Sequence, residues 1–207
     1  MKDIFLIGYS GHAYVVCDIF KSRGLKVTGY FDKTEKQENP YHLKYLGSER
    51  DGLSNQILQT SDYFIAIGNY HIREEVYNYL KNNNFGNLLN AIHSSAWISE
   101  KASLHDGVLL GANTIVNSLA SIHCCTIINT GVIVEHECRI GAFSHIASGA
   151  TLAGNVKVGH RSFIGANAVV KEGITIGNEV VVGAGAVVIK DIPDCKTVVG
   201  NPGRVID

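Results

Sequence analysis

The sequence predicts two domains of different fold class, a small α/β unit followed by a parallel β-helix. In the first half, short apolar runs alternate with helical patterns, and in the second half aliphatic residues recur every six positions. Apolar residues make up 45% of the 207 residues, which is enough for a core in each domain. We place the boundary after residue 92, so that the domains are 1–92 and 93–207.

The first domain reads as strands separated by helices. An apolar run at 3–8 predicts a strand, and strands are also expected at 26–32, 62–69 and 88–92. A helix that ends at Gly24 follows the first strand, and an amphipathic helix over 71–83 follows the third; the apolar face of the first helix carries Val15, Val16, Ile19 and Phe20. The polar segment 33–61 predicts a loop and a short helix, and we assign it no chemistry. This alternation is typical of a parallel sheet.

Polar and glycine residues follow the strands of this domain, where α/β sheets bind ligands. They are Gly8, Ser10, Gly11, His12, Asp32, Gly68 and Asn69. The first loop departs from the dinucleotide fingerprint G-x-G-x-x-G, which needs glycine where this chain has Ser10 and Ala13. It still presents a helix N-terminus to a phosphate, and Asp32 suits a ribose hydroxyl. A merely tight strand–helix turn fits the loop equally well.

The second domain is defined by its six-residue period. Sixteen successive positions carry Ile, Leu or Val, at 98, 104, 110, 116, 122, 128, 134, 140, 146, 152, 158, 164, 170, 176, 182 and 188. Small or β-branched residues tend to lie two positions earlier. Glycine follows the aliphatic residue at Gly111, Gly141, Gly159, Gly165, Gly177 and Gly183.

A period of six fits neither a helix nor a flat strand. It predicts a triangular coil of three short sides, ~18 residues in all, stacked on its neighbours at the strand spacing. The aliphatic residues point inward, and we expect the six glycines to supply the turn backbone. A β-sandwich would need turns every ~8–12 residues and would not hold this phase.

A polar run, VIVEHEC at 132–138, interrupts the repeat. Its phase places His136 outside the core, and it places His145 there too. Imidazole titrates near neutral pH and suits a general base, and a flanking carboxylate can fix its tautomer. Of Glu135 and Glu137 only one can pair easily, and we expect Glu137. Cys138 falls at an inward position, so we expect it to be packed rather than nucleophilic.

Bulk properties exclude several functions. A formal net charge of −1 gives no attraction for nucleic acid or an anionic membrane. The five cysteines contain no CxxC pair, so reduced thiols are expected. The apolar run at the start is too short for a signal peptide or a membrane span. We therefore expect a cytoplasmic protein without a membrane segment.

Several motifs together resemble a known family. The GYSGH loop, the FIAIGN strand end, the EHEC…FSH…AGN block and the closing VVGNPGRVI are similar to those of sialic acid O-acetyltransferase and PglD-like sugar acetyltransferases. The resemblance covers essentially the whole chain. It implies a Rossmann-like N-terminal domain and a left-handed β-helix built from hexapeptide repeats. It also implies a homotrimer with active sites between subunits.

The same resemblance implies an activity and roles for individual residues. The activity is N-acetylation of the 4-amino group of a nucleotide-linked 4-amino-4,6-dideoxy sugar, with acetyl-CoA as co-substrate and no bound cofactor or metal. His136 is then the general base and Glu137 its orienting partner. Asn129 contacts the sugar, while acetyl-CoA meets His145, Gly154 and Ala184. Ser10, Gly11, His12, Asp32, Lys33, Gly68 and Asn69 bind the nucleotide sugar.

Two departures and three alternatives stay open. Lys33 stands where the family often has a second acid, which leaves the base undefined, with uridine as the first expectation; Gly203 replaces a usual alanine. A sugar O-acetyltransferase would use the same residues. A zinc-dependent hydratase is suggested by His105 and His123, one coil apart, although the third position on that line is Gly141. A non-catalytic assembly protein would leave the EHEC run unexplained.

Overall fold

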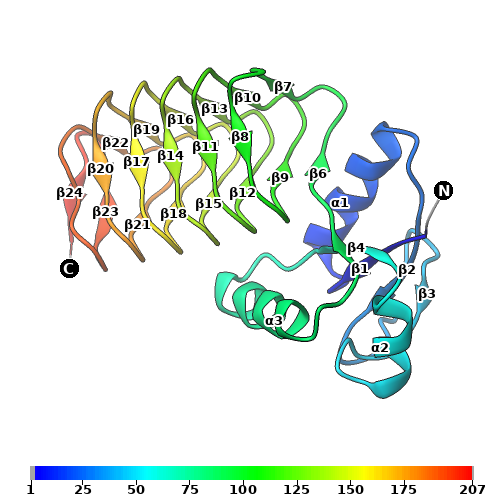
Figure 1. Ribbon diagram of the computed structural model, residues 1–207. Helices are drawn as coiled ribbons and strands as arrows, with labels where there is room; N and C mark the ends of the chain where they lie inside the picture. The colour runs from blue at the N-terminus through cyan, green and yellow to red at the C-terminus, as the bar shows by residue number, and fades with distance from the viewer. Residues whose placement is uncertain (1–2, 207) are drawn as a thin grey trace. The chain divides into compact units, whose positions relative to one another are not determined.

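The computed structural model describes residues 3–206, which form two compact units, one ending at Ser94 and the other beginning at Ser95 (Figure 1). The first unit is α/β and the second is a parallel β-helix. The fold class predicted from the sequence is therefore confirmed. No helix in the described part of the chain is long and apolar enough to cross a membrane.

The first unit is a parallel sheet with strand order β3-β2-β1-β4-β5. Its strands are β1 (Ile4–Ile7), β2 (Val27–Phe31), β3 (Lys44–Tyr45), β4 (Asp62–Ile65) and β5 (Asn87–Leu88), and a short strand β6 (Ala91–Ile92) ends the unit. Its helices are α1 (Gly11–Ser22), α2 (Gly52–Leu58) and α3 (Tyr70–Asn82). The sequence missed β3, because two residues are too few to show a period. Val15, expected on the buried face of α1, is exposed, while Ala13 and Cys17 are buried there.

The β-helix has three flat faces (Figure 1). Face 1 carries β7 (Trp97–Ile98), β10 (Ile115–Val116), β13 (Ile133–Val134), β16 (Thr151–Leu152), β19 (Val169–Val170) and β22 (Val187–Val188). Face 2 carries β8 (Ser103–Leu104), β11 (Ser121–Ile122), β14 (Arg139–Ile140), β17 (Lys157–Val158) and β20 (Thr175–Ile176). Face 3 carries β9 (Leu109–Leu110), β12 (Ile127–Ile128), β15 (His145–Ile146), β18 (Phe163–Ile164), β21 (Val181–Val182), β23 (Thr197–Val199) and β24 (Arg204–Val205).

The six-residue period sets what is inside. From Leu110 to Val188 every aliphatic residue of the period is buried. The small positions are buried as well, and the hydroxyls of Thr126, Ser144 and Ser162 donate to the backbone of the next coil, whereas that of Thr114 donates within its own coil. Ser144 Oγ donates to the carbonyl of Gly159 at 2.7 Å and accepts from the amide of Ser162 at 3.1 Å. Burial of apolar side chains and pairing of every buried hydroxyl therefore go together along the stack.

The reason predicted for the six repeat glycines was wrong. Positive φ recurs every six residues from Gly107 to Gly185, but it falls two positions after these glycines and is taken mostly by other glycines and asparagines. A Cβ at Gly111, Gly141, Gly159 or Gly165 would instead lie 2.5–2.7 Å from a backbone atom of the next coil. These glycines let successive coils approach closely, which a side chain would prevent.

Candidate functional site

The corner between faces 1 and 2 carries the polar run, just after β13. His136 and Glu137 are both exposed, and His136 Nδ1 lies 3.1 Å from Glu137 Oε2. Glu135 is engaged elsewhere, because its Oε2 accepts from Asn117 Nδ2 at 2.9 Å. The expected pairing with Glu137 is therefore present. Since a carboxylate only accepts, Nδ1 is the donor in this contact, and in the neutral form of the ring Nε2 carries the lone pair.

Gly154, one coil further on, lies under the imidazole. A Cβ at this position would be 2.6 Å from both Cε1 and Nε2 of His136, so only glycine lets the ring rest on the backbone there. The backbone carbonyl of His136 accepts from Asn155 N at 2.8 Å. The ring is thus held from below by Gly154 and from the side by Glu137, with Nε2 directed away from the carboxylate.

Cys138 follows this pair but faces inward. Its side chain is fully buried, and Sγ lies 3.1 Å from the carbonyl oxygen of Ala153. Burial raises the pKa of this thiol to about 11. A thiol that stays protonated at neutral pH is a poor nucleophile, which agrees with its expected packing role.

Other residues predicted for the site lie on different parts of the prism. His145 belongs to β15 on face 3, where its ring meets Phe163 edge-on at 5.2 Å between ring centroids. Asn129 and Ala184 follow β12 and β21, at the corner between faces 3 and 1. Face 3 is the side opposite the corner that holds His136. One protomer therefore does not bring these residues together with His136 and Glu137, and their functional roles stay predictions.

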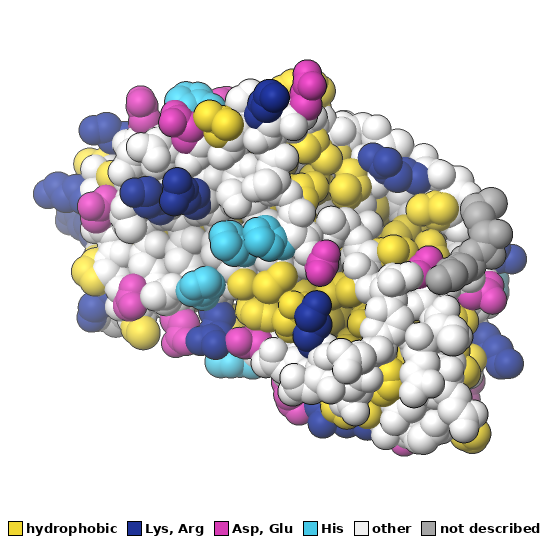
Figure 2. Space-filling model, viewed as in Figure 1, with side chains coloured by type: hydrophobic (Ala, Val, Ile, Leu, Met, Phe, Trp, Pro, Cys, Tyr) yellow, Lys and Arg dark blue, Asp and Glu magenta, His cyan; other side chains and the backbone are white. Residues whose placement is uncertain are grey.

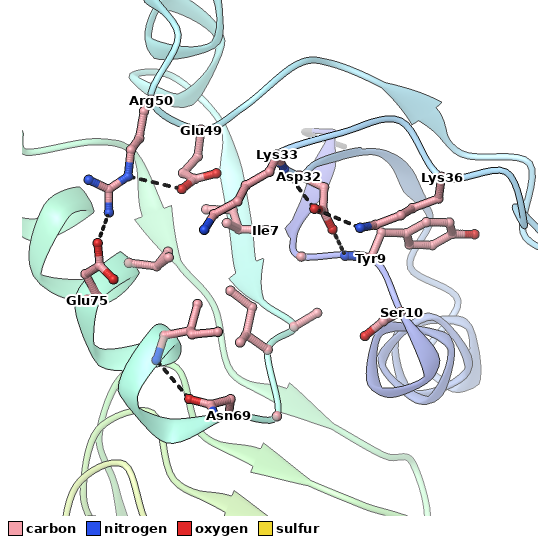
Figure 3. Close-up of a pocket in the computed structure, with 16 residues that line it drawn as sticks. Ile7, Tyr9, Ser10, Asp32, Lys33, Lys36, Glu49, Arg50, Asn69 and Glu75 are labelled. Atoms are coloured by element: carbon pink, nitrogen blue, oxygen red, sulfur yellow. Dashed lines mark hydrogen bonds and ion pairs between the residues drawn. The ribbon is translucent and has the colours of Figure 1, made fainter.

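The α/β unit contains a pocket of about 590 Å³ at the carboxyl ends of its central strands (Figure 3). Ser10, Asp32, Lys33, Gly68 and Asn69 line it, as expected for a ligand site of this fold. Gly11 and His12 do not line it, since they lie in the first turn of α1. Tyr9, Lys36, Glu49, Arg50 and Glu75 also line the pocket and were missed.

Asp32 organises the loops around this pocket. Its Oδ2 accepts from the amide of Tyr9 at 3.0 Å, and its Oδ1 accepts from the amide of Lys33 at 2.8 Å. The ammonium of Lys36 lies 3.0 Å from the same Oδ1. Asp32 thus joins the loop after β1 to the loop after β2 and retains little free acceptor capacity for a ribose.

The loop after β1 leaves its polar groups available. The side chain of Ser10 makes no capping hydrogen bond to α1 and points toward the pocket (Figure 3). A Cβ at Gly8 would lie 2.5 Å from Ile67 Cγ1, and the φ of Gly8 is +88°. Both the close contact and the positive φ therefore require glycine at this position. Asn69, in contrast, is committed as the cap of α3, because its side chain accepts from Ile72 N.

Besides the predicted Lys33, three charged residues of the pocket come from the segment 33–61, to which the sequence otherwise assigned no chemistry. They are Lys36, Glu49 and Arg50. Arg50 Nη2 lies 2.6 Å from Glu75 Oε1, and Arg50 Nε lies 3.5 Å from Glu49 Oε1. No motif could have pointed to these residues, because they are spread through an irregular loop and gather only when the sheet forms.

His12 is half-buried, and its ring lies near Arg73 of α3 rather than in the pocket. Its Nε2 is buried without a hydrogen-bond partner. Burial, together with the positive charge of Arg73, lowers the pKa of His12 to about 4. Arg73 is itself fully buried and donates to the carbonyls of Ile67 and Gly68 at 2.9 and 2.7 Å.

The two histidines that suggested a zinc site stack on each other. The rings of His105 and His123 lie 4.6 Å apart between centroids, with 12° between their planes. Burial lowers the pKa of His123, and so do the neighbouring His105 and His160. Among residues 3–206 there is no group of three His, Cys, Asp or Glu that could hold a metal ion.

Comparison with known proteins places the whole chain. The family model of the PglD N-terminal domain matches residues 3–80, and that of the hexapeptide repeat of succinyl-transferase matches residues 155–190. PerB from Caulobacter crescentus, crystallised in complex with CoA and GDP-perosamine, is 34% identical over 100% of this chain and 98% of its own, with a TM-score of 0.91. The chain belongs to the PglD-like sugar acetyltransferase family.

Two further relatives define how far the likeness to the PglD-like acetyltransferases extends. The acetyltransferase domain of PglB from Neisseria gonorrhoeae, in complex with acetyl coenzyme A, is 31% identical over 99% of both chains, with a TM-score of 0.91. An uncharacterised protein of Acanthamoeba polyphaga mimivirus is 30% identical over 115 residues, 54% of this chain. The matched segment spans only 21% of that viral protein.

Proposed function

We propose that this acetyltransferase moves the acetyl group of acetyl-CoA onto the 4-amino group of a nucleotide-linked 4-amino-4,6-dideoxy sugar. The pair of His136 and Glu137, exposed at a corner of the β-helix, is the observation that carries the proposal. The relatives support it: PerB was crystallised with CoA and GDP-perosamine, and the PglB domain with acetyl coenzyme A. Because acetyl-CoA is an intracellular metabolite, the proposal also places the reaction in the cytoplasm.

In the proposed reaction the amine nitrogen attacks the thioester carbonyl carbon. His136 Nε2 accepts the proton that the nitrogen loses, and Glu137 stabilises the imidazolium through Nδ1. The C–S bond then breaks, and the proton passes to the departing sulfur of coenzyme A. The acetyl group goes directly from thioester to amine, so the chemistry needs no nucleophile from the protein, in keeping with the buried thiol of Cys138.

We further propose that the complete site forms between subunits of a homotrimer. His145, Asn129 and Ala184, proposed to contact the thioester and the sugar, lie on face 3 or its corner with face 1, opposite His136. A second copy can supply them, because its face 3 can pack beside the His136 corner of the first copy. The proposed oxyanion donor His145 and the proposed base His136 then come from different protomers.

The outer surface of the β-helix supports this assembly. Face 1 exposes Trp97 (52%) and Val169 (41%), and face 3 exposes Phe163 (38%) and Val181 (43%). The outward residues of face 2 are instead hydroxyl-bearing or charged. Two apolar faces and one polar face are what a closed ring of three prisms requires, since each prism meets two neighbours and leaves one side to water.

We assign the nucleotide to the pocket of the α/β unit. The hydroxyl of Ser10, which lines the pocket at the N-cap of α1, suits a phosphate. Lys33 adds a positive charge at the pocket wall. Glu49, Arg50 and Glu75 line the other side of the pocket, where they would form hydrogen bonds with the edge of the base.

The test is acetyl transfer measured as thiol release, with acetyl-CoA and a panel of nucleotide-linked sugars that carry an amine or a hydroxyl at carbon 4. The amino sugars should be acetylated, and His136→Ala should lower kcat about a hundredfold with little change in acetyl-CoA affinity. Glu137→Gln should cost about tenfold, since it removes only the orienting charge. His105→Ala, an exposed histidine on another corner, is the matched control.

Equal turnover of His136→Ala and wild type would refute the assignment of the base. Acetylation of the hydroxyl sugars alone would turn the proposal into O-acetylation. Sedimentation measures the assembly: a fully active monomer would contradict the shared site.

A further inference from the structure

Face 2 carries five polar side chains in line, beginning with Ser103, and the last four of them come from four successive coils. The register pairs Ser121 with Arg139, Arg139 with Lys157, and Lys157 with Thr175. All four point outward, since Ile122, Ile140, Val158 and Ile176 beside them are buried. We call Ser121, Arg139, Lys157 and Thr175 the face-2 column.

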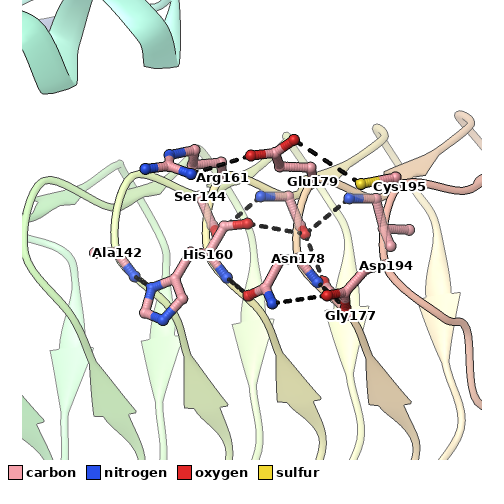
Figure 4. Close-up of polar contacts among 11 residues, drawn as sticks. Ala142, Ser144, His160, Arg161, Gly177, Asn178, Glu179, Asp194 and Cys195 are labelled. Atoms are coloured by element: carbon pink, nitrogen blue, oxygen red, sulfur yellow. Dashed lines mark hydrogen bonds and ion pairs between the residues drawn. The ribbon is translucent and has the colours of Figure 1, made fainter.

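The two cations of the column stand directly opposite each other on adjacent strands. Strands lie roughly 4.8 Å apart, and like charges in this arrangement destabilise a sheet. Elsewhere in the β-helix, residues one coil apart carry opposite charges. Arg161 and Glu179 form an ion pair with Nη1 and Oε1 3.0 Å apart (Figure 4). Among the described residues neither Arg139 nor Lys157 has an acidic partner within ion-pair distance.

Two carboxylates line the hollows around these cations, and each is bonded to another side chain rather than to Arg139 or Lys157. Arg139 and Lys157 line two adjoining hollows of about 420 and 430 Å³. Glu137, in the first hollow, is paired with His136. Asp194, in the second, accepts from the amide and side chain of Asn178, which lowers its pKa (Figure 4).

The remaining polar groups of the hollows are neutral or basic. The second hollow also includes His123 and His160. His160 Nδ1 accepts from the amide of Ala142 at 3.2 Å, which leaves its other nitrogen able to donate outward. Figure 2 shows Lys and Arg side chains on the β-helix face turned to the viewer, with histidines beside them and Asp and Glu side chains elsewhere on the same face.

We propose that the face-2 column is a phosphate subsite. A guanidinium and an ammonium side by side, flanked by two hydroxyls, match the oxygens of a diphosphate or a phosphomonoester. Binding such an anion removes the repulsion between Arg139 and Lys157. Because Glu137 shares the first hollow with these two cations, a ligand anchored there has its far end at the His136 corner.

The identity of the ligand that carries the phosphate is inferred from the proposed function. Coenzyme A carries a diphosphate and a 3′-phosphate, and a nucleotide sugar carries a diphosphate. Both have the chemistry that the column fits, so the experiment must separate them. No contact with the sugar or the acetyl group is required of the column.

Isothermal titration of coenzyme A, and separately of GDP and UDP, tests the subsite in Arg139→Ser, Lys157→Ser and the double variant. Each single substitution should weaken one class of ligand about tenfold, and the double variant about fiftyfold or more at low salt. The losses should shrink as salt is raised, because exposed charges are screened. The ligand that is weakened identifies the source, and pantetheine, which lacks phosphate, should bind all variants alike.

Lys26→Ser is the matched control, since Lys26 is an exposed lysine of the α/β unit and the change in charge is the same. Thermal unfolding should show that the variants fold as well as the wild type, because they remove exposed side chains. Control-like affinities for all three ligands, or a wild type that binds none of them, would overturn the subsite. Absence of acetyl transfer together with weakened binding would instead refute the proposed function and leave the subsite in place.

Discussion

The two units of this chain place their side chains by different rules. In the β-helix the surroundings of a residue repeat: Thr126, Ser144 and Ser162 are each buried and each donate to the carbonyl of a glycine in the next coil. In the α/β unit Arg73 is buried as deeply, yet its contacts with the carbonyls of Ile67 and Gly68 follow no pattern in the sequence. In the β-helix the place of a residue in the six-residue period therefore predicts its surroundings, whereas no such period exists in the α/β unit.

Because the period predicts what each position needs, a residue that departs from the pattern is easy to recognise in the β-helix. The fold imposes positive φ at one position in every six, and glycine or asparagine occupies most of these positions. Six positions carry other residues, namely Leu119, Cys125, Glu137, Phe143, Arg161 and Glu179. Of these, Leu119 and Glu137 lie one coil apart, and both are exposed. Non-glycine residues in this conformation cost free energy, and such costs gather at functional sites. Glu137, the proposed partner of His136, is one of these departures, whereas the candidate site of the α/β unit is seen as a pocket.

The largest expected effect contrasts two glycines. Gly159→Ala should lower the free energy of unfolding by about 3 kcal/mol, because the new Cβ would meet the backbone of Gly177 at 2.5 Å. Gly11→Ala, at the start of α1, should be neutral or stabilising by about 0.5 kcal/mol, since nothing lies within 4 Å of its Cβ position. Denaturant unfolding of both variants measures the difference. Similar stabilities would show that the coils can separate without cost.

An intermediate effect concerns the α/β unit and pH. The folded pKa of His12, about 4, lies below its ordinary value of 6.5, so between these values only the unfolded chain takes up the proton. The stabilising contribution is present above pH 6.5 and is lost as pH falls through 4. Between pH 7 and pH 4.5 the wild type should lose about 2 kcal/mol more stability than His12→Leu.

Urea unfolding across this pH range measures the difference, with His71→Gln, an exposed histidine of α3, as the control. Parallel curves for wild type and His12→Leu would mean that the His12 ring opens to water before it titrates. His12 would then behave as a mobile surface group rather than as part of the packed α/β unit.

The smallest expected effect on stability concerns Leu119, which departs from the Gly/Asn pattern of the repeat. Leu119 has φ of +63° and is 61% exposed, so Leu119→Asn should stabilise the protein by about 1 kcal/mol by relieving the left-handed backbone. Leu53→Asn, an exposed leucine in α2, should give no such gain. Thermal unfolding checks both. A destabilised Leu119→Asn would indicate that another copy of the chain covers this side chain.

Sequence alone predicted the β-helix in detail, because each inward position is fixed by the period and no distant contact is needed to find it. It also placed His136 outside the core, since strand phase settles which side chains face out. It favoured Glu137 over Glu135 as the partner of His136 because only one flanking carboxylate can pair easily. It failed for the role of Gly159, whose neighbour lies in another coil, and for Lys36, Glu49 and Arg50, which converge only through the sheet. The separation of His145 from His136 follows from phase too, once the faces are assigned.

One small element closes the stack at the C-terminal end. β24 runs antiparallel to β23, whereas the described strands before it on the three faces run parallel. An uncapped coil would offer its free N–H and C=O groups to the next molecule in the same register, and end-to-end growth of prisms would follow. The reversed strand presents the wrong direction and polarity for such growth. Removal of residues 203–207 should therefore convert a discrete enzyme into a chain that polymerises into fibres.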